Sequence, residues 1–228
     1  MAIILDLCGG TGAWSRPYKE AGYEVYVITQ PQFDVTLAYF KDGHIVFWDT
    51  ARKVPAMLKI PFEYISGILA APVCTEFSIA KGAQPRDFHK GMETVEACMR
   101  IIWEVQKHTK LDFWALENPR GLLRRFLGRP SYIFEQWQFG GDKVKATDIW
   151  GYFNPPKPIV KQKPENMTVR YPNGNTNSVG WGKYKCPSEY ADYINSLDGY
   201  IAKRAACRAI TPKGFAEAFY RANKIKRS

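Results

Sequence analysis

Ala2-Ile3-Ile4-Leu5-Asp6-Leu7-Cys8-Gly9-Gly10-Thr11-Gly12-Ala13-Trp14 is the stretch that decides the fold. Residues 2–7 are mostly apolar, which predicts a buried strand. Three glycines then end the strand, and a short helix is expected over residues 15–21. Glycines let the backbone approach a ligand closely, so this loop is a candidate cofactor cradle. The loop matches neither the GxGxxG pattern nor the P-loop, which ends in Gly-Lys-Ser/Thr.

Strands and helices alternate beyond this stretch. Further strands are predicted over residues 24–29, 44–48, 65–71 and 111–116, and helices over residues 88–108 and 121–127. The helix over 88–108 is indicated by apolar residues that recur at helical spacing. Two β-rich runs, 132–139 and 147–153, flank Gly140-Gly141-Asp142 and predict a hairpin. We therefore expect an α/β, Rossmann-like fold with a mixed, mostly parallel sheet and a β-hairpin at one edge.

Residues 154–185 differ from the rest of the chain in composition. They are rich in Pro, Asn, Gly and Lys and contain no clear core element. This is the best candidate for a small irregular recognition segment. Thr211 and Pro212 then predict the start of a final helix, with Thr211 as its N-cap.

Length, charge and hydropathy limit the kinds of partner. A chain of 228 residues suits one core domain with a small appendage. Its 32 Lys and Arg exceed its 22 Asp and Glu, giving a net charge of +10 that favours a polyanionic partner, although a solvated basic surface is the alternative. No apolar run reaches the roughly 18 residues that a membrane span needs. The start of the chain is unlike a signal peptide, so we expect a cytoplasmic protein with no membrane partner.

The cysteines indicate a reducing compartment. There are five, Cys8, Cys74, Cys98, Cys186 and Cys207, and no two form a CxxC pair. The odd number argues against a disulfide framework, and the spacing argues against a zinc site. The three histidines have no ligand-like spacing either. We therefore expect no disulfides and no metal.

Three loops follow predicted strands: Cys8–Trp14, Pro72–Ser78 and Glu117–Gly121. Ligands of parallel α/β sheets bind beyond the carboxyl ends of the strands, so these loops should open on one edge. Cys74 in the second loop is placed for nucleophilic chemistry, although a free cysteine is also a common packing residue. Glu117 ends an apolar strand, where desolvation makes its protonated form more accessible; a cap or a salt bridge is the alternative role.

Taken together, these segments resemble the cytosine carbon-5 methyltransferase family in its small, phage-type form. The family patterns DLFxGxG, PCxxFS and ENx stand here, in this order, as Asp6–Gly12, Val73–Ser78 and Glu117–Pro119. Two later stretches, Lys145–Gly151 and Arg208–Pro212 with the helix that follows, also resemble the family. The cysteine loop and the Glu-Asn-Pro corner are specific, whereas the glycine loop alone is not.

The resemblance implies a class I methyltransferase fold. Residues 1–153 and 204–228 would form the catalytic domain, and residues 154–203 a small insertion that is a candidate DNA-recognition segment. The implied activity is that of a DNA (cytosine-5-)-methyltransferase, which transfers methyl from S-adenosylmethionine to carbon 5 of a cytosine flipped out of DNA. Cys74 would add to ring carbon 6, and Glu117 would hold or protonate ring nitrogen 3.

The same resemblance implies the remaining site residues. Those expected to bind the cofactor are Asp6, Cys8, Gly9, Gly10, Thr11, Gly12, Trp14, Thr29, Asp34 and Pro72. Those expected to bind the substrate base are Ser78, Asn118, Pro119, Lys145 and Thr147. Candidate phosphate contacts, each alternatively a surface charge, are Arg16, Arg86, Arg120, Arg124 and Arg125.

The chain departs from the family pattern mainly where the cofactor would bind. Cys8 replaces a Phe whose ring packs on the adenine, and Trp14 is the candidate replacement. The second predicted strand ends in Thr29-Gln30, where an acid usually binds the ribose hydroxyls, and Asp34 is a candidate for the adenine amino group. Val73 and the Ala after Lys145 are further departures, and the large target-recognition domain of the family is missing.

Three alternatives stay open from the sequence. The chain could be a transfer-RNA cytosine methyltransferase that uses the same chemistry. It could be a catalytically silent relative that binds DNA. It could also transfer a one-carbon group other than methyl, which the altered cofactor loop suggests. The target sequence and the oligomeric state do not follow from the sequence.

Overall fold

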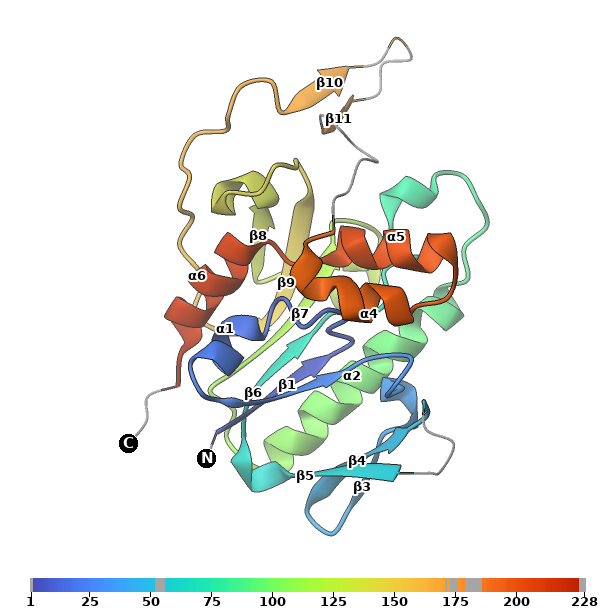
Figure 1. Cartoon of the computed structure of the whole chain (residues 1–228), viewed down its shortest axis with the longest axis vertical. Coiled ribbons are helices and arrows are strands. Elements are labelled where there is room, and N and C mark those ends of the chain that lie inside the picture. Colours follow the sequence, from blue (N-terminus) through green and yellow to red (C-terminus); the bar gives the residue numbers. More distant parts are fainter. Residues whose placement is uncertain (1, 52–55, 171, 173–175, 179–185, 226–228) are drawn as a thin grey trace.

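The fold is built around one six-stranded sheet with strand order β2-β1-β6-β7-β9-β8 (Figure 1). The computed structural model describes residues 2–51, 56–170, 172, 176–178 and 186–225. The strands of the sheet are β1 (Ile3–Leu7), β2 (Glu24–Ile28), β6 (Ile65–Ala70), β7 (Phe113–Pro119), β8 (Tyr132–Glu135) and β9 (Ala146–Tyr152). Strands β2, β1, β6 and β7 are parallel, whereas β9 is antiparallel to both β7 and β8. The expected α/β fold with a mixed, mostly parallel sheet and an edge hairpin is confirmed at this level.

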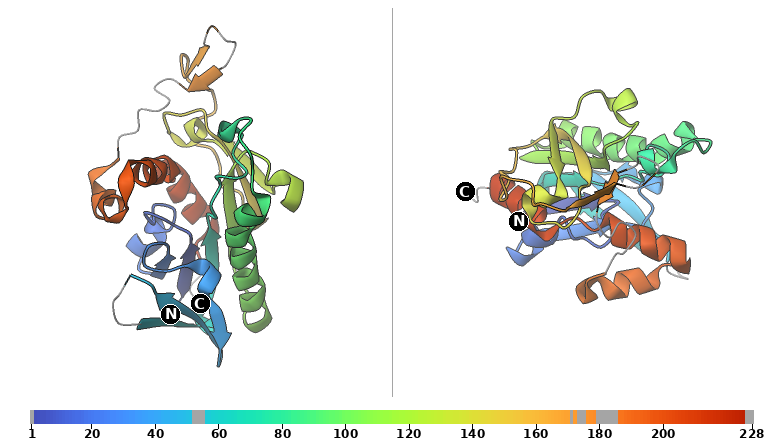
Figure 2. Two further views of the ribbon diagram at one scale, coloured as in Figure 1. Left: turned by 90° about the vertical axis from the view of Figure 1, so that its right-hand side faces the viewer. Right: turned by 90° about the horizontal axis from the view of Figure 1, so that it is seen from above.

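Helices cover both faces of this sheet, as Figure 2 shows. On one face lies α2 (Phe88–His108), which begins and ends where the apolar spacing predicts. The other face carries α1 (Arg16–Glu20), α4 (Ala191–Ser196), α5 (Gly199–Ala209) and α6 (Lys213–Asn223). A short helix, α3 (Arg124–Leu127), follows β7. Two apolar cores result, one under α2 and one under α1 and α6.

Two smaller β structures lie outside the main sheet. Strands β3 (Tyr39–Lys41), β4 (His44–Asp49) and β5 (Ala56–Pro61) form an antiparallel sheet of their own. The strand predicted over 44–48 is therefore real, but it does not extend the parallel sheet. A ribbon of β10 (Thr168–Arg170) and β11 (Thr176–Ser178) projects at the top of Figure 1. Single-turn helices complete the structure: η1 (Val35–Leu37), η2 (Phe62–Tyr64), η3 (Ile79–Lys81), η4 (Gln136–Phe139) and η5 (Ser188–Tyr190).

Several local predictions need correction. The run 132–139 is a strand only as far as Glu135, because Glu135 and Gln138 form a reciprocal capping box that starts η4. The N-cap of α6 is Pro212 and not Thr211, and no side chain caps this helix. Residues 154–185, where no core element was expected, contain the separate β10–β11 ribbon outside the main sheet.

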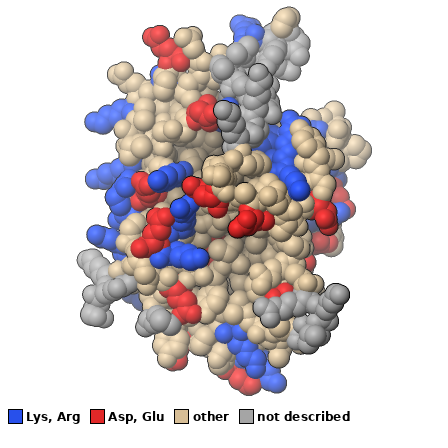
Figure 3. All heavy atoms as spheres, in the orientation of Figure 1, with Lys and Arg blue, Asp and Glu red and all other residues tan. Residues whose placement is uncertain are grey.

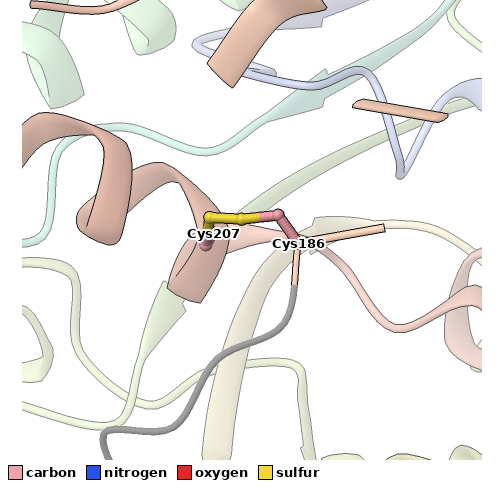
Figure 4. Close-up of a disulfide and its surroundings, with 2 residues drawn as sticks. All are labelled: Cys186 and Cys207. Carbon is pink, nitrogen blue, oxygen red and sulfur yellow. A yellow bond between two sulfur atoms is a disulfide. The ribbon is translucent and has the colours of Figure 1, made fainter. Parts of the chain in front are cut away.

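The expectation of no disulfides is wrong. Cys186 and Cys207 are joined in a disulfide with a Cα–Cα distance of 5.4 Å, within the usual range (Figure 4). The bond links the last turns of α5 to the segment before η5 and leaves Cys8, Cys74 and Cys98 free. An odd number of cysteines does not prevent one pair from forming, so the count carries no argument about the redox compartment. In the described part of the chain, no helix has the length and apolar character that crossing a bilayer requires.

Candidate active site

Strand register brings the second and third predicted loops beside the first. Leu7 at the end of β1 pairs with Ala70 at the end of β6, and Ala70 pairs with Leu116 of β7. The backbone therefore leaves these three strands at the same level of the sheet. The loop with Cys74 and the end of β7 with Glu117 consequently lie next to each other at the carboxyl edge, where α/β sheets bind ligands.

Hydrogen bonds tie the cysteine loop to the end of β7. The Asn118 side chain donates from Nδ2 to the Pro72 carbonyl at 3.1 Å, and the Leu122 N–H donates to the Phe77 carbonyl at 2.9 Å. Gly121 is required at this crossing, because a Cβ atom there would lie 2.3 Å from the Phe77 oxygen. Asn118 is fully buried. It therefore positions the loop, and its Oδ1 has no hydrogen-bond partner among the described residues.

Helix α2 and η3 hold the other side of the cysteine loop. The Val73 N–H donates to the Thr94 hydroxyl at 3.2 Å, and Arg86 Nη1 donates to the Glu76 carbonyl at 2.7 Å. The hydroxyl of Ser78 caps η3 by accepting a backbone N–H at 3.2 Å. Ser78 and Arg86, proposed as substrate and phosphate contacts, therefore both support the loop in this structure.

The electrostatic surroundings of Cys74 connect it to Glu117. Burial raises the pKa of the free, half-buried Cys74 thiol, and the negative charge of Glu117 raises it further. The positive charges of Lys145 and Arg208 act in the opposite direction and lower it. Burial also raises the pKa of Glu117, with Lys145 opposing this shift and Asp148 adding to it. A thiol, a carboxyl and two cations thus share one site at the sheet edge.

A small cavity of about 10 Å³ separates Glu117 from the glycine loop. It is lined by Trp14, Glu117, Phe134, Gln136, Lys145, Thr147, Ala209, Ile210, Thr211, Pro212 and Phe215. Such a volume holds about one water molecule. The segment 209–212 closes it, and Lys145 Nζ donates to the Arg208 carbonyl at 3.2 Å. As it stands, this cavity is too small for an aromatic ring.

Lys145 and Thr147, two of the expected substrate-binding residues, lie beside Glu117. Each lines the small cavity beside Glu117, Lys145 half-buried and Thr147 buried. Thr147 reaches this position because β9 pairs antiparallel with β7, with Pro119 opposite Thr147 in the register. The structure thus brings Glu117 of β7, Lys145 just before β9 and Thr147 of β9 together around this cavity.

The glycine loop turns sharply at the end of β1. Cys8, Gly10 and Gly12 have positive φ angles of 56°, 57° and 68°. The Gly10 N–H donates to the Thr29 hydroxyl at 3.2 Å, which ties the loop to the end of β2. Thr11 and Gly9 are half-buried in the turn. Among the residues expected to bind the cofactor, those of the glycine loop and Thr29 therefore lie together at the end of β1.

Cys8 faces the interior of the domain. Its Sγ lies 4.0 Å from Sγ of Cys98 on α2, and the side chain packs against the core under α2. The side chain therefore does not replace the aromatic ring that the family pattern has at this position.

Asp6 lies beneath the cradle with no exposed surface. Its Oδ2 accepts a hydrogen bond from the Ser15 hydroxyl at 2.5 Å, and its Oδ1 has no partner within the described part of the chain. Burial raises the pKa of Asp6 to about 7. A Cβ atom on Gly9 would lie 2.4 Å from the Asp6 carboxyl, so the loop can pass over this side chain only as glycine.

Trp14 does not offer an open ring face to an adenine. Its ring is buried and packs against Phe215 and Phe219 of α6, with centroids 6.0 and 5.3 Å away. The prediction that the Trp14 ring packs on an adenine, in place of the aromatic ring missing at Cys8, is therefore wrong for this structure. The buried indole Nε1 nevertheless lacks a hydrogen-bond partner among the residues described, and the side chain lines the cavity beside Glu117.

Asp34 lies near the end of β2, in the wall of a second cavity of about 400 Å³. Its Oδ1 accepts hydrogen bonds from the Thr36 N–H and hydroxyl, and its Oδ2 accepts one from Gln30. These bonds hold the side chain in place and lower its pKa against the opposing effect of burial, which is the largest single contribution. Asp34 thus borders a space large enough for a ligand.

The five candidate phosphate contacts differ in how they are engaged. Arg124 forms a bidentate salt bridge with the fully buried Asp148, and Arg120 lies 4.0 Å from the same carboxylate. Arg16 is paired with Glu20 and with Glu189. Arg125 is exposed, and no ion pair of it is found in the described residues. Arg125 remains the most available of the five for a phosphate.

Charge is dispersed over the face of the molecule shown in Figure 3, where Lys and Arg side chains lie beside Asp and Glu side chains. The net charge of +10 is therefore not gathered in a single patch on that face. Within the described ranges, no group of three or more His, Cys, Asp and Glu side chains lies together in a way that could hold a metal.

Three features of the site were missed from the sequence. They are the cation Arg208, the closing segment 209–212, and Tyr193 of α4, whose ring lies over the glycine loop. Arg208 and the closing segment belong to a stretch that resembles the family, and this resemblance could have marked them as site residues. No signal marks Tyr193, because α4 has no strong apolar periodicity.

Comparison with known proteins adds no further assignment. No family model matches the sequence, and no curated protein gives a significant match.

Proposed function

We propose that this chain transfers a methyl group from S-adenosylmethionine to carbon 5 of cytosine in DNA. The observation that carries this proposal is that the Cys74 loop and the end of β7 with Glu117 lie side by side at the carboxyl edge of the sheet, with the charge of Glu117 acting on the thiol. Nucleophilic attack on a pyrimidine needs a thiolate on one side of the ring and a hydrogen-bonding acid at its edge. The mixed sheet with an edge hairpin also agrees with the class I methyltransferase fold that the resemblance implies.

The residues of the cradle fit the proposed cofactor. The glycine loop approaches β2, and beside it the buried Trp14 Nε1 has no partner in the described residues. An unpartnered buried N–H is costly, and a carboxylate such as that of an amino acid would satisfy it. When bound, S-adenosylmethionine supplies an electrophilic methyl group on a sulfonium.

The protein residues would activate the cytosine from two sides. Lys145 and Arg208 stabilise the Cys74 thiolate, which forms a bond to ring carbon 6. Glu117, whose pKa burial raises, donates a proton or hydrogen bond to ring nitrogen 3 and prevents negative charge from building on the ring. Carbon 5 then becomes nucleophilic. Once carbon 5 carries the methyl group, a base such as water would take the carbon-5 proton and Glu117 would take back any proton given to ring nitrogen 3. The carbon–sulfur bond would break as the ring double bond forms again, which returns the Cys74 thiolate.

DNA is the proposed partner because the target base must leave its stack to reach Cys74. The positive net charge supports binding to a polyanion, and exposed Arg125 follows directly on the Glu117 loop. Binding that depends on phosphate contacts should weaken steeply with salt. The β10–β11 ribbon belongs to the insertion 154–203, and we propose this ribbon as its DNA-recognition part.

Nucleoside mass spectrometry of cells expressing the protein tests this function. Wild-type protein should produce 5-methylcytosine in DNA, and Cys74→Ala should produce none. Cys98→Ala removes the buried free cysteine of α2 and is the matched control, for which we expect activity to be retained. Methylcytosine confined to RNA would favour a transfer-RNA enzyme, a different mass would indicate another one-carbon group, and no modified nucleoside would indicate a silent DNA-binding relative.

A further inference from the structure

A cavity of about 400 Å³ lies just beyond the end of β2. Its lining residues come from two distant parts of the chain: Gln30, Pro31, Asp34, Leu37, Thr50, Ser196, Leu197 and Asp198. The volume falls in the range typical of small-molecule sites. The lining contains both apolar and polar side chains. A nucleoside needs both, because it carries a flat, largely apolar ring and two adjacent hydroxyls.

One wall of this cavity belongs to α4 and the start of α5, which are docked over the cradle. Arg16 of α1 pairs with Glu189 at 2.6 Å and lies over the Tyr190 ring at 5.9 Å. The Tyr193 hydroxyl donates to the Gln30 carbonyl at 3.4 Å. These contacts hold a segment from the far end of the chain against the end of β2, and Figure 1 shows α4 beside β1 and the glycine loop.

The side chain of Asp198 is the polar group of this wall with unused hydrogen-bonding capacity. Gln30, Asp34, Thr50 and Ser196 each form hydrogen bonds within the protein. Asp198 is the N-cap residue of α5, yet its side chain caps no N–H of that helix. Nor does any ion pair engage it within the described ranges. A carboxylate that faces a cavity and has no partner is available to a ligand.

The end of β2 lacks a carboxylate that could bind the two hydroxyls of a ribose. Thr29 stands there, and its hydroxyl already accepts the Gly10 N–H. Asp198 reaches the same cavity from the opposite wall. A carboxylate accepts two hydrogen bonds from adjacent hydroxyls more strongly than a neutral group does.

We propose that this cavity binds the nucleoside half of the methyl donor and that Asp198 accepts hydrogen bonds from its ribose hydroxyls. This inference rests on the proposed function, because it takes S-adenosylmethionine as the donor. Leu37, Leu197 and Pro31 provide the apolar surface for the base, and Asp34 borders its polar edge. Helix α4 and the start of α5 thus complete the cofactor site and determine its specificity for a ribonucleoside.

Calorimetric titration with S-adenosylhomocysteine and with its 2′,3′-dideoxy analogue tests the assignment. Asp198→Asn keeps a good N-cap residue but removes the charge, so the fold should be retained. It should weaken binding of S-adenosylhomocysteine roughly 10- to 100-fold, as expected for loss of charge-assisted hydrogen bonds. The dideoxy analogue, which lacks the hydroxyls, should bind the wild type and this variant with similar affinity. Asp192→Asn, which removes an exposed acid of α4 outside the cavity, should change neither affinity.

The outcomes separate this inference from the proposed function. If the wild type binds S-adenosylhomocysteine and Asp198→Asn binds it equally well, the inference is overturned while the proposed function stands. Equal loss of affinity for both ligands would also overturn it, since the role of Asp198 would then be structural. If the wild type binds neither ligand, both the inference and the cofactor assignment of the proposed function fail.

Discussion

Cys74 shares one site with Glu117: burial contributes most to the raised pKa of the Cys74 thiol, and the negative charge of Glu117 raises it further. Cys74 lies in the loop after β6 and Glu117 near the end of β7, and the register of these two parallel strands places Ala70 opposite Leu116. In the ligand-free protein this arrangement keeps the thiol protonated. A base whose ring nitrogen accepts a hydrogen bond from protonated Glu117 would favour the neutral form of that side chain. The negative charge that opposes the Cys74 thiolate would then be absent, so substrate binding and thiolate formation are linked.

Alkylation of Cys74 should respond in opposite directions to two substitutions. Glu117→Gln removes a negative charge and should lower the pKa of Cys74. Lys145→Met removes a positive charge and should raise it. Because the thiolate fraction rises more than the nucleophilicity of the thiolate falls, we expect faster alkylation in Glu117→Gln and slower alkylation in Lys145→Met. Iodoacetamide labelling across pH, read by peptide mass spectrometry, measures both effects. Equal rates in all three proteins would show that the two charges do not reach Cys74.

The stability of the protein should fall as pH rises through the acidic range because of Asp6. Burial raises its folded-state pKa from 3.8 to about 7, so between these values the folded state binds more protons than the unfolded state. The contribution of Asp6 to the free energy of unfolding is therefore greatest below pH 4. By pH 7 and above, the protein has lost at most about 4 kcal/mol of this contribution. Asp6→Asn should flatten this part of the curve.

Urea unfolding between pH 4 and pH 8 checks this dependence. The difference between wild type and Asp6→Asn isolates the contribution of Asp6 from that of the other titrating groups. Asp112→Asn, at an exposed position, should keep the slope of the wild type. An unchanged slope in Asp6→Asn would contradict the raised pKa.

Two adjacent arginines should behave differently when they are replaced. Arg124→Met leaves the fully buried Asp148 without its bidentate partner and should destabilise the fold by about 3–5 kcal/mol. Arg125→Met should leave the melting temperature nearly unchanged, because its side chain is exposed. The same substitution should weaken DNA binding and reduce its salt dependence if Arg125 contacts a phosphate. Calorimetry measures the melting temperatures, and DNA binding at several salt concentrations measures the phosphate contact. An Arg124→Met protein as stable as the wild type would contradict the role given to this salt bridge.

Reduction of the disulfide between Cys186 and Cys207 should destabilise the protein. The bond closes a loop of sequence separation 21 and constrains the unfolded chain, for which we expect roughly 2–4 kcal/mol. Unfolding in urea with and without dithiothreitol measures the effect. The double variant Cys186→Ser, Cys207→Ser should match the reduced protein and no longer respond to reductant. A wild type indifferent to reductant would refute the stabilising role.

The sequence predicts the main sheet and α2 well because local patterns determine them. Residues 88–108 combine helical apolar spacing with an Asp87 N-cap, and the helix has these ends. The strands before the three loops were found because each is a short apolar run bounded by glycine, proline or a polar residue. Their common edge then follows from parallel pairing alone.

Features that depend on distant contacts were not predictable in this way. The disulfide forms because α5 brings Cys207 to Cys186, and the cavity beside Asp34 exists because α4 docks on the end of β2. Trp14 was expected to face a cofactor, but packing of its ring against Phe219 is decided by α6, some 200 residues away. Local sequence carries no information about these partners.

The most direct measurement is covalent capture of the enzyme on duplex DNA that contains 5-fluorocytosine, in the presence of S-adenosylmethionine. Fluorine at carbon 5 cannot leave as a proton does, so the carbon–sulfur bond should persist. We predict a stable complex whose digestion yields the peptide containing Cys74 joined to the base, and no complex with Cys74→Ala. Absence of any adduct with wild-type protein, or an adduct through another residue, would contradict the account.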